Sequence, residues 1–279
     1  AYALVSYQTA WLKVNYPAEF MAAVLSSEMA NTDKIVTFIE ECRAMGLKIL
    51  PPAVNYSNFR FQANDQGQVV YGLGAIKGVG EGPIESVLIS RAENGDFSDL
   101  FDFCRRVDLK RLNKRALEAL IRAGALDEQG EHRAILMASI EAAVAAAEQQ
   151  ARNADIGMVD LFGDVHEAGP AGEWSDALAW TDDERLQAEK ETLGLYLTGH
   201  PIDQYESELG RFVQVRLADL QPTRRGQNTT IAGLLLAQMG FKPIILERGK
   251  SVRQRTKDTW GLWRKSELNP ESNVQFGEG

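Results

Sequence analysis

The sequence has few residues that could hold a metal ion or close a disulfide framework. It contains two cysteines and three histidines, spread over 279 positions: Cys42, Cys104, His132, His166 and His200. No spacing typical of a zinc site occurs among them, and two distant cysteines cannot form a disulfide framework. Because both cysteines lie among apolar neighbours, we expect two buried, reduced thiols and no metal site.

Long apolar runs are also absent. No stretch approaches the roughly 20 apolar residues of a membrane-spanning helix. The first residues, AYALVSYQTAWLK, lack the basic region and cleavage site of a secretory leader. The apolar fraction of 44% and the charged fraction of 25% are typical of a soluble globular protein. These features favour a cytoplasmic protein with no membrane partner.

Positive charge is in short supply. The 39 acidic residues outnumber the 30 basic ones, and the net charge is −9. This excess argues against nucleic acid as a partner, but net charge describes solubility better than it describes a local site. Basic residues are concentrated between 105 and 122, where only Asp108 and Glu118 oppose them: Arg105, Arg106, Lys110, Arg111, Lys114, Arg115 and Arg122. A basic patch is therefore expected there, although a solvated helix face is the commoner role of such a run.

Periodicity and helix-end signals predict a mainly helical chain. Pro17 suits the first turn of a helix that continues through AEFMAAVLSSEMA. A second helix is expected between Asn31 and Gly46, which supply its cap and its end. From Gly72 to about Ala151 the chain favours short helices with tight joints, in the segments PIESVLISR, SDLFDFCRRV, NKRALEALIRA and HRAILMASIEAAVAAAEQQ.

Extended structure is expected in two places. The runs FRFQ and QVVY flank the turn-like ANDQG and predict a small hairpin. From Arg211 the branched runs FVQVRL and TTIAGLLLAQ predict the start of a β domain. Between these places, residues 153–180 lose periodicity and resemble a linker, after which Thr181 and Glu184 form a capping box for one more helix that ends at Gly194.

Five glycines are concentrated in GLGAIKGVGEGPIESVL, residues 72–88. Such a window fits a cradle for a nucleotide phosphate, a hairpin that binds a DNA backbone, or a turn with no ligand. A dinucleotide site requires Gly-x-Gly-x-x-Gly after a buried strand, and a phosphate loop ends in Gly-Lys-Ser or Gly-Lys-Thr. Neither pattern is present, so nucleotide binding is disfavoured.

The DNA-binding interpretation depends on a sharp turn between two helices at Gly78-Val79-Gly80. Glycine permits a positive φ and lets a phosphate approach without a Cβ in the way. The unpaired amides at the start of the following helix can then bind the anion. Val79 packs between the helices, and Lys77 adds a charged contact. This arrangement resembles the helix-hairpin-helix motif, and a glycine turn that only joins two packed helices remains the alternative.

A second joint, IRAGALDEQ, keeps Gly124 but has Leu126 where a second glycine would sit, so a phosphate has poorer access there. The basic run before this joint favours DNA as the ligand. The predicted DNA-binding residues come from the first turn and from this run: Lys77, Gly78, Val79, Gly80, Gly82, Lys110, Arg111, Lys114 and Arg115. Contacts of this kind hold duplex phosphates and do not read the base sequence.

Long stretches of the chain, within about residues 1–238, are similar to the alpha subunit of bacterial replicative DNA polymerase III. They are SYQTAWLKVNYPAEFMAAVLSSEM, ILPPAVNYSNFRF, YGLGAIKGVGEGPIESVL, LNKRALEALIRAGALD and ETLGLYLTGHPIDQY. The resemblance implies the end of a fingers domain with a small β-hairpin (1–71) and a tandem helix-hairpin-helix module (72–152). It further implies a linker with a clamp-binding-like segment and one helix (153–210), and an incomplete OB-fold-like domain with a divergent tail (211–279).

The resemblance also implies a function. The chain would be the DNA-gripping portion of a DNA-directed DNA polymerase, with duplex primer-template as its partner. The family's catalytic aspartates and their Mg²⁺ ions lie in a palm domain outside these residues, so we expect no catalytic residue and no cofactor here, and no activity of this segment alone. A stand-alone helix-hairpin-helix adaptor in repair or recombination is the alternative, and a pure interaction scaffold is a third interpretation.

A short segment of the linker resembles the family's peptide for binding the sliding clamp. It reads Met158-Val159-Asp160-Leu161-Phe162, with Leu161 and Phe162 as apolar residues in a polar stretch. Met158 replaces the glutamine of the family's pattern. The resemblance therefore implies the sliding clamp and other replication subunits as partners. After Gln238 the sequence does not match the family, so we expect a barrel that cannot close.

Overall fold

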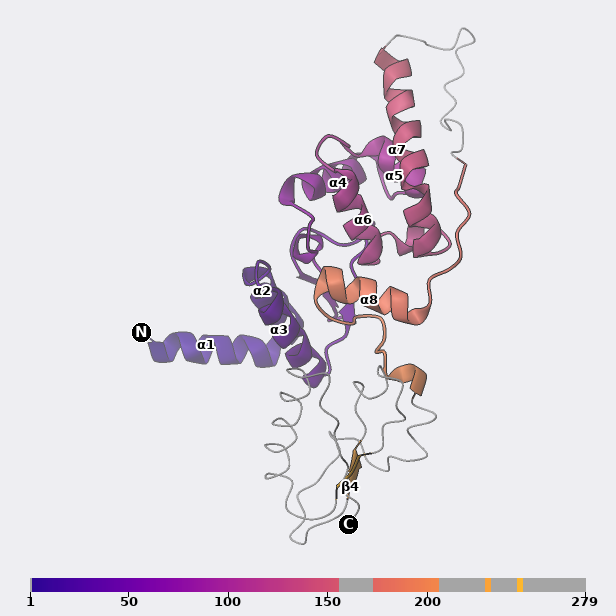
Figure 1. Cartoon of the computed structure of the whole chain (residues 1–279). Helices are drawn as coiled ribbons and strands as arrows, with labels where there is room; N and C mark the ends of the chain where they lie inside the picture. The colour runs from indigo at the N-terminus through magenta and orange to yellow at the C-terminus, as the bar shows by residue number, and fades with distance from the viewer. Residues whose placement is uncertain (1, 156–172, 206–228, 232–244, 248–279) are drawn as a thin grey trace. The chain divides into compact units, whose positions relative to one another are not determined.

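The computed structural model describes residues 2–155, 173–205, 229–231 and 245–247. The chain divides into two compact units, residues 1–200 and 201–279. The first unit is built mainly from helices (Figure 1), which confirms the predicted fold class. Within the described residues, no helix is both long enough and apolar enough to cross a membrane.

The first unit begins with the helices α1 (Tyr2–Asn15), α2 (Pro17–Ser27) and α3 (Thr32–Ala44). Pro17 occupies the first turn of α2, and the Asn31 side chain caps α3 by accepting a hydrogen bond from the Lys34 N–H, as predicted. Both helices bury one face in the core. By contrast, α1 has no buried side chain and extends away from the other two (Figure 1).

A small three-stranded sheet follows, with the strand order β1-β3-β2. The strand β2 (Gln62–Ala63) pairs antiparallel with β3 (Val69–Val70), which confirms the predicted hairpin. The strand β1 (Ile49–Leu50) pairs parallel with β3 and was not predicted. A strand of two residues gives no alternation from which it could have been recognised.

The element before the glycine turn is not an α-helix, contrary to the prediction. It is η1 (Leu73–Ala75), a short 3-10 helix. A Cβ on Gly72 would lie 2.7 Å from the backbone of Arg60 and Phe61, and one on Gly74 would lie 2.6 Å from Cε2 of Phe59. These two glycines therefore serve close packing, and glycine also disfavours a longer helix.

The centre of the first unit consists of α4 (Glu81–Asn94), α5 (Leu100–Arg106), α6 (Lys114–Arg122) and α7 (Arg133–Asp155), which the sequence predicted as helices. The side chains of Asp99 and Asn113 accept hydrogen bonds from the third residue of α5 and of α6 and so cap these helices. The helices share one core, and α5 packs closely against α7. The short 3-10 helix η2 (Asp127–Gln129) joins α6 to α7.

Both cysteines are buried and free, as predicted. Burial raises the pKa of the Cys42 thiol to about 11 and that of the Cys104 thiol to about 12. Both thiols are therefore protonated at neutral pH and behave as small apolar core residues.

The last helix of the first unit, α8 (Asp182–Leu193), has the predicted capping box of Thr181 and Glu184, and Gly194 ends it at a φ of 83°. In the second unit, η3 (Asp203–Tyr205) and an antiparallel pair, β4 (Thr229–Ile231) and β5 (Ile245–Glu247), are described. β4 begins within the predicted run TTIAGLLLAQ, whereas FVQVRL lies outside the described residues. The OB-like start stays a prediction.

Candidate nucleic-acid interface

The glycine turn lies between η1 and α4. Gly78 has a φ of 86°, in the left-handed region that favours glycine. Gly80 is the N-cap of α4 with φ −86° and ψ 173°, an extended conformation that any residue adopts. The requirement for a positive φ therefore falls on Gly78 alone, and Gly80 differs from other residues here only by lacking a Cβ.

Backbone amides of this turn are open at the protein surface. Gly78, Gly80 and Glu81 are exposed, and Gly82 is partly exposed. In the part of the chain that the structure describes, the amides of these four residues donate no hydrogen bond. Since α4 also has no side-chain cap, its N-terminal amides remain available to an anion.

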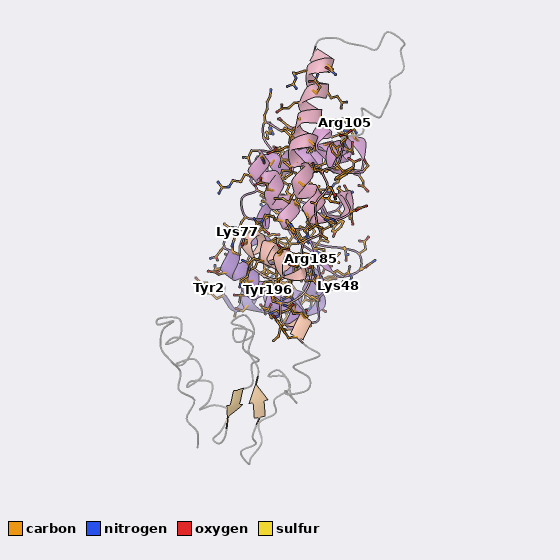
Figure 2. All side chains as sticks on the ribbon, turned by 45° about the vertical axis from the view of Figure 1, so that its right-hand side comes forward. Tyr2, Lys48, Lys77, Arg105, Arg185 and Tyr196 are labelled. Atoms are coloured by element: carbon orange, nitrogen blue, oxygen red, sulfur yellow. The ribbon has the colours of Figure 1, made fainter. Side chains whose placement is uncertain are left out.

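Two other amides of the turn are already engaged. Lys77 N–H donates to the carbonyl of Thr192 over 2.9 Å, and Val79 N–H donates to the carbonyl of Ile76 over 3.2 Å. The Val79 side chain is buried and belongs to the hydrophobic core, so it fixes the turn to the core. The Lys77 side chain, labelled in Figure 2, is exposed beside the open amides.

A carboxylate that the sequence analysis passed over lies in the same place. Glu81 is exposed in the first turn of α4, next to the open amides. Its charge interacts favourably with the helix dipole and opposes the approach of a second anion. Among the predicted DNA-binding residues, Lys77 is the basic residue nearest to Glu81 in the sequence, and its positive charge opposes the negative charge of Glu81.

The predicted basic residues Lys110, Arg111, Lys114 and Arg115 are all exposed. They differ in their partners. Arg111 pairs with Glu85 at 3.4 Å and with Asp108 at 3.6 Å, and Lys114 pairs with Glu141 at 2.6 Å. For Lys110 and Arg115 the described residues provide no carboxylate partner.

The Lys114–Glu141 pair changes the titration of both groups. A hydrogen bond from Lys114 lowers the pKa of Glu141, and the same hydrogen bond raises the pKa of Lys114. Both groups are solvent-exposed, so this pair adds little to stability. It does leave less of the Lys114 charge free for another anion.

Three arginines of the expected basic patch are not part of a free cationic surface. Arg105 and Arg106 both bind Asp102 at 2.9 Å, and Arg122 pairs with Glu191. Arg106 also donates to backbone carbonyls at the end of α4 and lies over the Phe97 ring at 4.2 Å. The free basic residues of this patch are therefore limited to the loop before α6 and to the first turn of α6.

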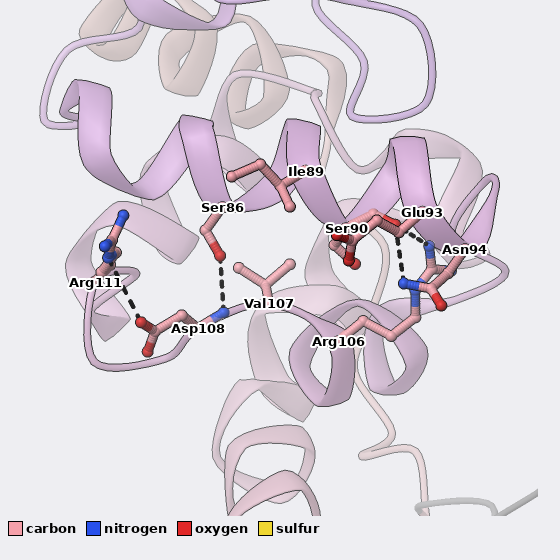
Figure 3. Close-up of a pocket in the computed structure, with 9 residues that line it drawn as sticks. All are labelled: Ser86, Ile89, Ser90, Glu93, Asn94, Arg106, Val107, Asp108 and Arg111. Carbon is pink, nitrogen blue, oxygen red and sulfur yellow. Dashed lines mark hydrogen bonds and ion pairs between the residues drawn. The ribbon is translucent and has the colours of Figure 1, made fainter.

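A shallow hollow of about 390 Å³ lies beside α4 (Figure 3). Ser86 accepts a hydrogen bond from the Asp108 N–H across it, and Ile89 lines its floor and is half-exposed. Its two arginines, Arg106 and Arg111, already bind carboxylates, and its lining also contains Glu93 and Asp108. The charges balance, so the hollow has no preference for an anion.

The second joint is closed to a phosphate. Gly124 has a φ of 84°, and a Cβ there would overlap the Arg133 guanidinium, with Cζ at 2.9 Å. Arg133 binds Asp127 through two hydrogen bonds of 2.7 and 2.8 Å. Burial lowers the pKa of Arg133, but its bonds to Asp127 and Glu189 outweigh this and raise it. A cation of the protein thus fills the space beside this glycine.

Two further predictions concern other parts of the chain. The clamp-binding residues Asp160, Leu161 and Phe162, and Met158 before them, lie outside the described residues. Among the residues that are described, no group of three or more His, Cys, Asp or Glu side chains could hold a metal ion.

Comparison with known proteins identifies one motif and one kind of relative. A family model described as helix-hairpin-helix motif matches residues 46–136. DNA polymerase III subunit alpha of Pseudomonas aeruginosa is 56% identical in an alignment of 254 positions, which covers 85% of this chain and 22% of that protein. The Vibrio cholerae protein of the same name is 51% identical, over 92% of this chain and 22% of its own length.

DNA polymerase III subunit alpha of Haemophilus influenzae is 48% identical in an alignment of 280 positions, which covers 100% of this chain and 24% of that protein. This alignment includes the residues after Gln238, which we expected to diverge. The chain thus spans between a fifth and a quarter of the length of the relatives it matches.

Proposed function

We propose that this chain, which belongs to the family of DNA polymerase III alpha subunits, is the part of such a polymerase that holds the phosphate backbone of duplex DNA. The observation that carries this proposal is the set of unbonded amides of the exposed residues Gly78, Gly80 and Glu81 and of the partly exposed Gly82. The helix-hairpin-helix match at residues 46–136 supports it, because it includes this turn.

The contacts follow from the geometry of the turn. Phosphate oxygens accept hydrogen bonds from the open amides at the start of α4, where the helix dipole also favours negative charge. Lys77 adds a charge-assisted bond from one side of the turn. Arg115 and Lys110 continue the cationic surface, and Arg111 and Lys114 contribute less because carboxylates already hold them. None of these groups reads a base edge, so binding is independent of sequence.

The whole protein, on this proposal, carries out template-directed DNA synthesis in the cytoplasm. Its catalytic carboxylates and Mg²⁺ ions belong to a palm domain outside these residues, so the 279-residue chain alone incorporates no nucleotide. Residues 1–71 would form the end of the fingers, 72–152 the DNA-gripping module, 153–210 the linker and 211–279 an OB-like start. A stand-alone repair adaptor is disfavoured, because the matched relatives align with 85% or more of the chain and bear the name of the polymerase subunit.

The sliding clamp and other replication subunits are proposed as further partners. The support is the sequence pattern Asp160-Leu161-Phe162, in which two apolar side chains can fill a pocket of a partner. In a pull-down with purified clamp, replacing Leu161 and Phe162 by alanine should abolish binding. Equal recovery of the wild-type and double-alanine chains would show that these residues do not bind the clamp.

Duplex binding is tested with the Gly80→Val variant. A Cβ at Gly80 would meet only Cδ of Pro83, at 3.8 Å, so valine fits without disturbing the turn but covers the open amides. We expect roughly a tenfold rise in Kd for a fluorescent 20-base-pair duplex, which corresponds to about 1.4 kcal/mol. Circular dichroism checks the fold, and a second duplex of unrelated sequence should give the same Kd. A folded variant with wild-type affinity would remove the turn from the interface.

A further inference from the structure

The phosphate-binding turn is tied to a helix that reaches it from far along the chain. The Lys77 N–H donates to the carbonyl of Thr192, in the last turn of α8. Carbonyl groups in the last turn of a helix have no partner within the helix, so this one is free to accept the bond. Lys77 begins the turn, and its neighbour Gly78 carries the first open amide. The position of α8 therefore fixes where the turn starts.

α8 is itself held by a carboxylate inside the protein. Glu189 has no exposed surface and lies three residues before Thr192. Its Oε2 accepts hydrogen bonds from the backbone N–H groups of Leu197 and Thr198, at 2.9 and 3.1 Å. Its Oε1 accepts bonds from the Thr198 hydroxyl at 2.7 Å and from Arg133 Nη2 at 3.2 Å. All of these bonds fix α8 against the chain that follows it and against the start of α7.

Arg133 extends this connection to the second joint. The guanidinium is buried, binds Asp127 and the carbonyl of Arg122, and lies against Gly124. It thereby joins the end of α6 to α8 through Glu189. Ala119 of α6 also lies beside the turn, since a Cβ built on Gly78 would be 3.9 Å from the Ala119 Cβ. The turn therefore has α8 and α6 as neighbours, and Glu189 connects these two helices.

We propose that Glu189 is a positioning residue for DNA binding, which acts through Thr192 on the turn at residues 77–82 and touches no DNA itself. The proposal rests on the proposed function of that turn. If Glu189 is neutralised, Arg133 keeps only Asp127 as a carboxylate partner, and α8 loses its charged attachment to α7. The Thr192 carbonyl then no longer fixes the Lys77 amide, and the open amides lose their common orientation.

The test compares Glu189→Gln with the matched control Glu191→Gln in the full 279-residue chain. Glu191 is a carboxylate of the same helix, but it is half-exposed and pairs with Arg122 on the surface. Duplex affinity and the hydrogen-exchange rate of the Lys77 amide are measured for both variants. We expect Glu189→Gln to raise Kd roughly fivefold and to accelerate exchange at Lys77 at least tenfold, and Glu191→Gln to change Kd less than twofold.

A second variant covers the case in which Glu189→Gln does not fold. Thr198→Val removes the hydroxyl bond to Glu189 and the bond that this hydroxyl accepts from Arg185, and keeps the charge of Glu189. It should give a smaller change of the same sign in both measurements. Unchanged Lys77 exchange and unchanged Kd in the folded variants would overturn the proposal. The Gly80→Val variant separates the two ideas: if it also binds DNA normally, the proposed function of the turn fails, whereas if it alone weakens binding, only the role of Glu189 fails.

Discussion

The α-carbon of Gly78 faces the methyl group of Ala119, since a Cβ built on Gly78 would lie 3.9 Å from the Ala119 Cβ. This proximity places the turn at residues 77–82 beside α6. Arg115 precedes Ala119 by one helical turn and therefore lies on the same face of α6. The turn and the unpaired arginine, which are far apart in the sequence, thus form one surface.

Arg115 and Lys114 should contribute differently to DNA binding. Replacing Arg115 by glutamine is expected to weaken duplex binding roughly three- to tenfold and to lower the slope of log Kd against log salt by about one. Replacing Lys114 should have a clearly smaller effect, because Glu141 already holds its ammonium group. Fluorescence anisotropy at several salt concentrations measures both quantities. Equal slopes for the two variants would contradict the assignment.

Alanine substitutions at Gly78 and at Gly80 should differ in their effect on the unfolding free energy. Gly78→Ala forces alanine into the left-handed region and should cost about 1 kcal/mol of unfolding free energy. Gly80→Ala should cost almost nothing, because its backbone is extended and space is open around it. Urea denaturation of the two variants tests this. A larger loss of stability at Gly80 than at Gly78 would show that the turn is built differently.

Alanine substitutions at Gly124 and Gly46 provide a second comparison of stability. Both have a positive φ, but a Cβ at Gly46 meets no atom within 4 Å, whereas one at Gly124 overlaps the Arg133 guanidinium. Gly46→Ala should therefore cost about 1 kcal/mol. Gly124→Ala should cost about 3 kcal/mol or more, since Arg133 must leave a buried ion pair. Thermal and urea unfolding report the difference, and equal losses would mean that Arg133 moves aside freely.

Asp102 should make stability depend on pH. Burial raises the pKa of this carboxyl, but hydrogen bonds from Arg105, from the Ser98 N–H and from Arg106 outweigh burial and hold the pKa below its ordinary value of 3.8. A carboxyl whose pKa is lower in the folded state stabilises that state when the pH is above the pKa of the unfolded chain. This stabilisation is lost as the pH falls through the pKa of the folded state. Asp102→Asn should therefore cost about 3 kcal/mol at pH 7.

The difference between wild type and Asp102→Asn should shrink as the pH falls below about 4, where the carboxyl of the unfolded chain becomes protonated first, and should go on shrinking until the folded carboxyl is also protonated. Urea titrations at pH 7, 5 and 3 follow this convergence. A constant difference over this range would indicate that Asp102 stabilises the protein without its charge.

Local signals in the sequence were enough to predict most of the helices and where they end. Asn31, Thr181 and Gly194 predicted helix ends that the structure contains, because capping depends on atoms within a few residues. The hairpin around the Asn/Asp/Gly turn was predicted for the same reason. The strand β1 was missed, and η1 was predicted as a longer helix, because each depends on close contacts with distant backbone.

The sequence by itself determined that a glycine turn and a helix N-terminus occur together at residues 77–82, since glycine content and helix periodicity are local properties. Only the tertiary structure decided that Lys114 and Arg122 are paired, because Glu141 and Glu191 reach them from other helices. The tertiary structure also placed the Arg133 guanidinium beside Gly124, where it blocks a phosphate, and placed the Thr192 carbonyl of α8 where it accepts a hydrogen bond from the Lys77 N–H. The pairs of Glu141 with Lys114, of Glu191 with Arg122 and of Glu189 with Arg133 join residues that no local pattern connects.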